Sequence, residues 1–285
     1  ENRMLSDKIS TIYGILNGTC NYILSQMDEK KISFEVALKN AQLSGFAESN
    51  PHDDISGTDT AYKLLIISNL IFSTNFKIRE VYTEGIAKVS SLDLKMAEKL
   101  GYKILLLGIS SIKNNILQLR VHPCLVLRSS ILAKVKNELN ALVIDGDMSD
   151  KIMLIGKGAG KNPTSASVIS DIINFKNNKI RNLSYIKSNI VTYKKANMLG
   201  RKGRFYIRMG VLDKPGVLAD ITSLFKKKKI SISSMLQLEE KVLGYVQLIF
   251  TTHITLEKQL VLALKKIENI DKVTKINFIR IENNL

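Results

Sequence analysis

Carboxylates and one lysine gather in a short stretch of a chain that is otherwise basic. Residues 45–63 read GFAESNPHDDISGTDTAYK, and the apolar run LLIISNLIF follows at once. The whole chain has a net charge of +16, so a local acidic group favours a site over a solvated surface. Carboxylates bind cationic groups through charge-assisted hydrogen bonds, and a lysine ammonium can stabilise and protonate an alkoxide. The charged residues are Glu48, Asp53, Asp54, Asp59 and Lys63.

Two helices are expected to position these groups. Residues 33–44 begin with an N-cap serine and show an amphipathic pattern, and Gly45 is placed to end that helix. After the acidic loop, a second helix is predicted over residues 57–71. Asp59 and Lys63 are four residues apart, so they lie on one face of its first turns. Taken alone, such a pair is an ordinary surface ion pair that contributes about 0.3–0.5 kcal/mol.

Glycines mark two further segments where the backbone can approach a ligand closely. In residues 12–27, a short strand through Ile15 is expected to pass through the turn at 17–19 into a helix from about Asn21. Residues 156–174 read GKGAGKNPTSASVISDIIN, in which glycines precede a predicted helix. Backbone N–H groups at such a helix start can bind an anion or a carbonyl. A plain strand-to-helix connection and a glycine-rich hairpin remain as the alternative interpretations, because the spacing is not GxGxxG.

The rest of the pattern predicts two domains joined by a linker. Residues 203–284 read as β-α-β-β-α-β, the order of a ferredoxin-like module with two helices on one face of an antiparallel sheet. The predicted domains are therefore 1–185 and 203–285, with a polar linker at 186–202. Strands and short helices alternate in the middle of the first domain, which favours a helix-covered sheet. The strands are expected at 104–109, 117–121, 142–145 and 152–155, and the helices at 92–100 and 131–137.

Composition narrows the class of protein. The 285 residues are 45% apolar, which is a globular profile. The two cysteines, Cys20 and Cys124, lie far apart, so we expect neither a disulfide framework nor a metal-ligand cluster, and a reducing cytoplasm follows as the location. No apolar run approaches the roughly 20 residues that span a bilayer, which predicts no membrane partner. The basic run 226–229 ends a predicted helix, and no aromatic residues alternate with basic ones, so nucleic acid is not expected as a partner.

Three ordered segments resemble one enzyme family. The stretch 45–63 meets the pattern G-(F/Y)-x-E-x-x-P-x-x-D-x-x-G-x-D-x-x-x-K, which resembles the catalytic signature of the homoserine dehydrogenases. The segments GILNGTCNYIL (14–24) and GKGAGKNPTSAS (156–167) are similar to that family's, in the same order. The opening DKPGVLADI of the last module looks like that of an ACT domain. The residues that meet the signature are Gly45, Phe46, Glu48, Pro51, Asp54, Gly57, Asp59 and Lys63.

The resemblance implies a fold, a reaction and a ligand set. The fold would be α+β, a mixed α/β catalytic and dimerisation domain followed by a ferredoxin-like ACT domain. The reaction would be the reduction of L-aspartate-4-semialdehyde to L-homoserine by NADPH or NADH, in threonine, methionine and isoleucine biosynthesis. The partners would be this substrate, threonine as an effector at the ACT domain, and further copies in a homodimer or homotetramer.

The resemblance also assigns roles to individual residues. Lys63, Asp59 and Asp54 would be catalytic, with Lys63 as the proton donor and Asp54 orienting it or the substrate. Glu48 and Asp59 would bind the substrate's ammonium group.

Gly45 and Gly160 would border the nicotinamide cofactor. The histidines have no place in the pattern: we interpret His52 as a loop residue, His122 as a strand-end residue, and His253 as part of the ACT-like module.

One part of the family pattern has no match. A complete member begins with a Rossmann unit carrying GxGxxG, and nothing here corresponds to it. Two hypotheses follow: the chain is a portion of a longer homoserine dehydrogenase, or it is a non-catalytic regulatory or dimerisation protein that has lost its dinucleotide domain.

Overall fold

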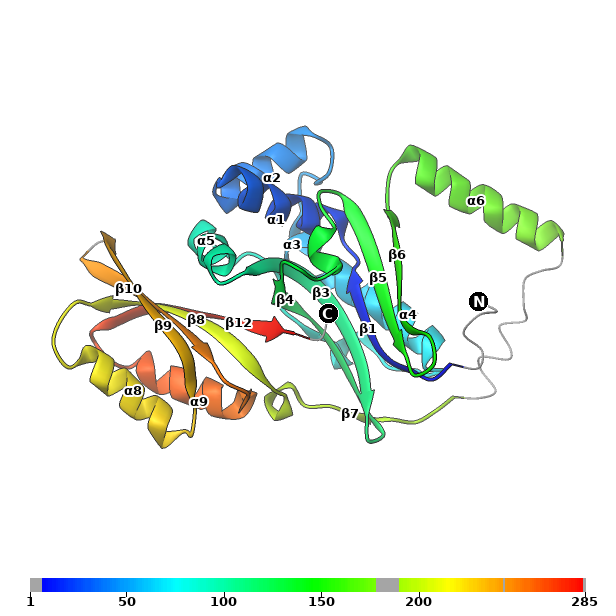
Figure 1. Cartoon of the computed structure of the whole chain (residues 1–285). Helices are drawn as coiled ribbons and strands as arrows, with labels where there is room; N and C mark the ends of the chain where they lie inside the picture. The colour runs from blue at the N-terminus through cyan, green and yellow to red at the C-terminus, as the bar shows by residue number, and fades with distance from the viewer. Residues whose placement is uncertain (1–6, 178–189, 243, 284–285) are drawn as a thin grey trace. The chain divides into compact units, whose positions relative to one another are not determined.

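The chain folds into two compact units. Each unit is made of several segments that alternate along the sequence. The computed structural model (Figure 1) describes residues 7–177, 190–242 and 244–283, so residues 186–189 of the predicted linker lie outside the described residues. None of the helices in these ranges is long and apolar enough to cross a membrane. The first unit is Glu1–Met96, Ile104–Pro123 and Ser129–Ala196, and the second is Ala97–Lys103, Cys124–Arg128 and Asn197–Leu285.

The first unit is built on a sheet with the strand order β6-β5-β1-β3-β4 (Figure 1). β1 pairs antiparallel with both β3 and β5, and β5 pairs antiparallel with β6. Two short strands, β2 and β7, pair in parallel with β4. All four strands predicted between residues 104 and 155 are confirmed, and each is longer than expected. The strands are β1 (Ile9–Ile15), β2 (Tyr82–Thr83), β3 (Tyr102–Lys113), β4 (Ile116–Leu127), β5 (Leu139–Gly146), β6 (Asp150–Lys157) and β7 (Lys194–Lys195).

The first unit also contains six helices and two 3-10 turns in its described residues. α4 packs on the sheet where β1 and β3 meet, because a side chain at Gly108 of β3 would lie 3.4 Å from Leu64 and Thr60 of α4. The predicted helices at 33–44, 57–71 and 92–100 are confirmed, and each of their ends lies within one residue of the prediction. The helices are α1 (Gly18–Lys30), α2 (Phe34–Leu43), α3 (His52–Ile55), α4 (Thr58–Ile71), α5 (Ser91–Lys99) and α6 (Lys161–Lys176), with 3-10 turns η1 (Ile78–Glu80) and η2 (Leu132–Lys134).

Three local expectations are wrong. The helix expected from about Asn21 begins at Gly18, because the Asn17 side chain caps it. The helix expected at 131–137 is only the turn η2, because the β-branched Val135 is extended and Asn137 has a φ of 55°. His122 is not at a strand end: it is fully buried inside β4, and its Nδ1 lies 3.0 Å from the carbonyl oxygen of Pro123.

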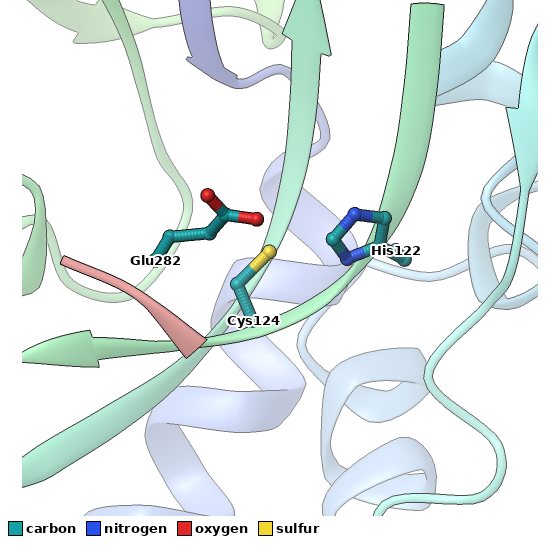
Figure 2. A group of neighbouring side chains, drawn as sticks. All are labelled: His122, Cys124 and Glu282. Carbon is teal, nitrogen blue, oxygen red and sulfur yellow. The ribbon is translucent and has the colours of Figure 1, made fainter. Parts of the chain in front are cut away.

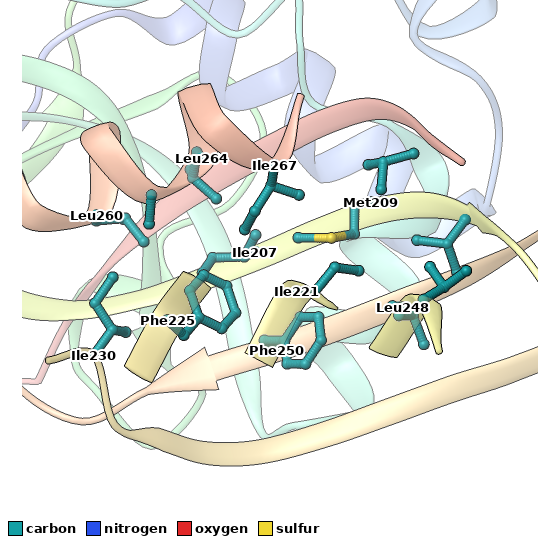
Figure 3. Close-up of a cluster of buried hydrophobic side chains, with 14 of the residues drawn as sticks. Ile207, Met209, Ile221, Phe225, Ile230, Leu248, Phe250, Leu260, Leu264 and Ile267 are labelled. Carbon is teal, nitrogen blue, oxygen red and sulfur yellow. The ribbon is translucent and has the colours of Figure 1, made fainter. Parts of the chain in front are cut away.

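The second unit confirms the predicted β-α-β-β-α-β order. Its sheet has the order β12-β8-β10-β9, with antiparallel pairing throughout, and β11 pairs with β8. α8 and α9 bury their apolar side chains against one face of this sheet (Figure 3). The elements are η3 (Met198–Gly200), β8 (Lys202–Leu212), α8 (Val217–Lys227), β9 (Ile232–Val242), β10 (Tyr245–Thr252), β11 (Thr255–Leu256), α9 (Glu257–Ile267) and β12 (Val273–Glu282).

A buried ion-pair network lies at the β12 edge of the second unit. The end of β4 joins β12 there in parallel, so that Cys124 faces Arg280 in the register. Figure 2 shows Cys124 on β4 and Glu282 at the end of β12, with His122 two residues earlier on β4. Arg280 is fully buried, and its Nη2 donates to Glu257 Oε1 at 2.5 Å. Both Arg280 and Glu257 are therefore buried charges that depend on each other.

Candidate active site

A glycine turn brings two of the predicted carboxylates together. Gly57 joins α3 to α4 with a φ of +82°, a conformation that residues with a Cβ rarely adopt. Its N–H donates to the carbonyl oxygen of Asp54 at 3.0 Å, and α4 starts at the next residue. A Cβ at Gly57 would lie 3.2 Å from the carbonyl oxygen of Glu84. The turn thus places Asp54 beside Asp59 in the first turn of α4.

Asp59 and Lys63 form an ion pair along one face of α4. The Lys63 Nζ lies 2.7 Å from Asp59 Oδ2 and donates a second hydrogen bond, at 3.3 Å, to the carbonyl oxygen of Leu16. The side chains are 48% and 30% exposed, so the pair contributes little to stability and is accessible to a small molecule. The predicted proton donor is therefore held in place by one acceptor on its own helix and by a second that is 47 residues away in the sequence.

Asn17 links the acidic residues to the start of α1, and sequence reasoning missed it. Its Nδ2 donates to Asp54 Oδ1 at 2.7 Å and to Asp59 Oδ2 at 2.8 Å. Its Oδ1 accepts the N–H of Cys20 at 2.7 Å, which caps α1. The available signal was an asparagine at the point where a strand pattern gives way to a helix pattern, which is the position of an N-cap.

Cys20 lies against the same group but does not carry chemistry there. Burial, followed by the nearby charges of Asp54 and Asp59, raises the pKa of its thiol well above the usual value. Its Sγ donates to the carbonyl oxygen of Asp54 at 3.1 Å. Cys20 therefore remains a neutral thiol that packs beneath the carboxylates. Cys124, the second cysteine, is also buried.

The two glycine segments of the sequence meet near Lys63. A Cβ at Gly18 would lie 2.7 Å from the carbonyl oxygen of Glu138, and one at Gly158 would lie 2.1 Å from Asn140 Nδ2. Asn140 Nδ2 also donates, at 3.4 Å, to the Leu16 carbonyl that holds Lys63. A side chain at Gly18 would therefore clash with the main chain, whereas one at Gly158 would displace the Asn140 side chain. Asn140 thus links the turn at 156–160 to the Leu16 carbonyl that Lys63 contacts.

The two glycines predicted to border the cofactor lie at helix ends. Gly45 follows α2 with a φ of +73° and open space where a Cβ would stand, and Gly160 precedes α6 with a φ of +110°. Among the described residues no side chain caps α6, so its first N–H groups suit a polar group of a cofactor.

Two further residues of the acidic stretch stand apart from the centre. Glu48 is exposed, and no hydrogen bond joins its carboxylate to Asp59 among the described residues. His52 is exposed too, but it begins α3 instead of lying in a loop.

Comparisons with known proteins agree on one family. Residues 1–173 match homoserine dehydrogenase, and residues 205–271 match the ACT domain. A homoserine dehydrogenase of Helicobacter pylori is 38% identical over 282 residues, which cover 98% of this chain and 66% of the relative. One of Bacillus subtilis is 32% identical, covering 100% of this chain and 66% of the relative. The crystal structure of a homoserine dehydrogenase from Thiobacillus denitrificans superposes with a TM-score of 0.89 at 35% identity, covering 99% of this chain and 66% of that one.

The chain belongs to the homoserine dehydrogenase family, and its C-terminal module is an ACT domain. It spans 66% of the length of the relatives from Helicobacter pylori and Bacillus subtilis. A more distant solved structure, a hyperthermophilic archaeal homoserine dehydrogenase mutant in complex with NADPH, superposes with a TM-score of 0.53 at 26% identity, covering 64% of this chain and 51% of that one.

Proposed function

We propose that this chain supplies the substrate-binding and proton-transfer part of a homoserine dehydrogenase. The reaction is the reversible reduction of L-aspartate-4-semialdehyde to L-homoserine, in the biosynthesis of threonine, methionine and isoleucine. The observation that carries the proposal is the Asp59–Lys63 pair, which is close and partly exposed. The Leu16 carbonyl accepts a hydrogen bond from Lys63, and the Asn17 amide donates one to Asp59, so both side chains are held in place. Family membership and the complete signature at 45–63 support the proposal.

The geometry suits proton transfer to an oxygen. An ammonium has three N–H donors, and Lys63 uses one for Asp59 and one for the Leu16 carbonyl within the described residues. The third donor is therefore directed to a substrate oxygen. In the reduction, that N–H bond breaks as the O–H bond of the product alcohol forms, and the neutral amine then takes a proton from solvent. In the oxidation, the neutral amine accepts the same proton.

The carboxylates suit the amino-acid end of the substrate. Asp59 binds the substrate's α-ammonium, and Glu48, which is exposed on the segment before α3, joins it when the substrate is bound. Asp54 orients the pair through Asn17. NADPH or NADH would lie against Gly45 and Gly160, where it would supply the hydride. One solved relative is described as a complex with NADPH, which supports this cofactor class.

The ACT domain suggests regulation of this reaction. We propose that it binds threonine as a feedback effector, and that the protein assembles as a homodimer or homotetramer in the cytoplasm. The second candidate function is a non-catalytic, amino-acid-binding regulatory protein, which the ACT domain at residues 205–271 favours. Calorimetry separates them: micromolar binding of NADPH supports the enzyme, whereas a threonine signal without NADPH binding supports the regulatory protein.

The proton donor is tested by Lys63→Ala, with Lys39→Ala on α2 as the matched control. Both lysines are exposed on helices, but only Lys63 contacts a carboxylate of the site. We expect Lys63→Ala to lower kcat for homoserine oxidation by about 10²–10⁴-fold, the usual contribution of a general acid or base, and Lys39→Ala to leave it unchanged. Retention of wild-type kcat by Lys63→Ala would rule out Lys63 as the proton donor.

A further inference from the structure

Asn17 connects three separate elements through a single buried side chain. It is 5% exposed and lies between β1 and α1. Its carboxamide oxygen caps α1, and its nitrogen reaches Asp54 on α3 and Asp59 on α4. The carboxylates are 37 and 42 residues away from Asn17 in the sequence, so this contact adds a long-range constraint to the local turn at Gly57.

Each N–H of the Asn17 amide has its own carboxylate. An amide nitrogen has two N–H donors in a fixed plane, and here one goes to each acid. Two carboxylates this close repel each other, and a neutral donor between them stabilises both anions without adding a positive charge. A lysine or arginine at position 17 would neutralise the negative charge that the substrate's ammonium needs. Asparagine therefore holds the acids together and preserves their charge.

The hydrogen bonds also divide the two oxygens of Asp59. Asn17 Nδ2 and Lys63 Nζ both contact Oδ2, at 2.8 and 2.7 Å. Within the described residues, Oδ2 is thus committed to protein donors, and Oδ1 is the oxygen left for a ligand. The carboxylate cannot rotate to exchange these oxygens without breaking both bonds.

We propose that Asn17 is a positioning residue for the reaction: it fixes Asp54 and Asp59 so that Asp59 Oδ1 receives the substrate's ammonium while Oδ2 holds Lys63 at the reacting oxygen. This inference rests on the proposed function. The inference adds Asn17, a residue outside the signature at 45–63, to the proposed site. The inference also specifies which oxygen of Asp59 binds the substrate.

The capping role and the positioning role can be separated by substitution. Serine and aspartate cap helices as well as asparagine, but neither carries an amide N–H pair. Asn17→Ser and Asn17→Asp therefore keep the cap of α1 and lose the bridge between the carboxylates, whereas Asn17→Ala loses both. Serine is neutral, and aspartate adds a third negative charge beside Asp54 and Asp59.

The test measures kcat, KM and the pH profile of homoserine oxidation with the complete protein and its cofactor. We expect the serine variant to fold but to melt at a lower temperature than wild type, because Asp54 and Asp59 lose a shared donor. The aspartate variant should melt lower still, because its charge repels both carboxylates. Both should lose about 10- to 100-fold in kcat, because a small misplacement of reacting groups has effects of this size. The rising limb of the profile should move to higher pH for Asn17→Asp only, since the added negative charge favours the protonated Lys63. Wild-type kcat and an unshifted limb in both folded variants would overturn the inference.

A structural measurement keeps this test independent of the proposed function. If the wild-type protein does not oxidise homoserine, the proposed function fails, and crystal structures of wild type and Asn17→Ser then decide the inference. We expect Asp54 and Asp59 to move apart and the Asp59 Oδ2–Lys63 Nζ bond to change in the variant. Carboxylates that stay in place would refute the positioning role.

Discussion

Among the described glycines with positive φ, Gly57 should be the most sensitive to an added methyl group, because its Cβ would have the closest neighbours. Gly57→Ala forces a Cβ into a φ of +82°, which costs roughly 1–2 kcal/mol, and into a contact of 3.2 Å with the carbonyl oxygen of Glu84. That backbone atom cannot give way as a flexible side chain can, so overpacking adds roughly 1–3 kcal/mol. The expected loss in the free energy of unfolding is therefore about 2–5 kcal/mol.

Gly101 offers a matched control for this prediction. It has nearly the same φ, +80°, but open space where a Cβ would stand. Gly101→Ala should cost only the conformational part, roughly 1–2 kcal/mol, and leave kcat unchanged. Gly57→Ala should also lower kcat by about 100-fold, because the turn sets Asp54 against Asp59.

Urea unfolding and steady-state kinetics on both variants check this pair of predictions. Equal losses of stability in the two, with unchanged kcat in Gly57→Ala, would show that the turn does not position the site.

Two further predictions concern charges away from this turn. Arg280→Leu should destabilise the second unit by about 3–5 kcal/mol in urea unfolding, because among the described residues it leaves the buried Glu257 with only the longer contact of 3.8 Å to Arg201. The double change with Glu257→Leu should recover most of the loss, and a double variant no more stable than Arg280→Leu would contradict this. Asp7 accepts hydrogen bonds from Ser149 and Met148, chiefly Ser149, which lower its pKa from 3.8 to about 2. Its stabilisation of the β5–β6 turn is thus complete above pH 3.8 and lost as pH falls through about 2, so the Ser149 amide should titrate by NMR with a midpoint near 2, and a midpoint near 3.8 would contradict the assignment.

The local parts of this structure could be predicted from the sequence. The alternating strands and amphipathic helices of residues 203–284 predict the ferredoxin-like order, which the structure confirms. The spacing of Asp59 and Lys63 predicts one helical face, and the two side chains are in contact there. The sequence pattern also predicts Gly45 and Gly57 at helix ends, where both have positive φ. In each case, a period or a local backbone requirement decides the outcome.

The long-range parts could not be predicted in this way. Asn17 reads as an ordinary turn residue until Asp54 and Asp59 are brought to it from α3 and α4. The direction and order of the strands depend on pairings such as β1 with β5, which are distant in sequence. The error at 131–137 has a different cause, since the apolar spacing there suits a helix while Val135 and Asn137 adopt other conformations.

One partner of Lys63 escapes any survey of side chains. The acceptor at residue 16 is the main-chain carbonyl of Leu16, one residue before the Asn17 cap. Alanine scanning at Leu16 would trim a buried apolar side chain and leave this oxygen in the chain. The contact can be removed only by rebuilding the backbone, for example with an ester in place of an amide, or by moving the turn that carries it. Part of this site is therefore formed by the main chain, and neither side-chain mutagenesis nor the identity of the residue would reveal it.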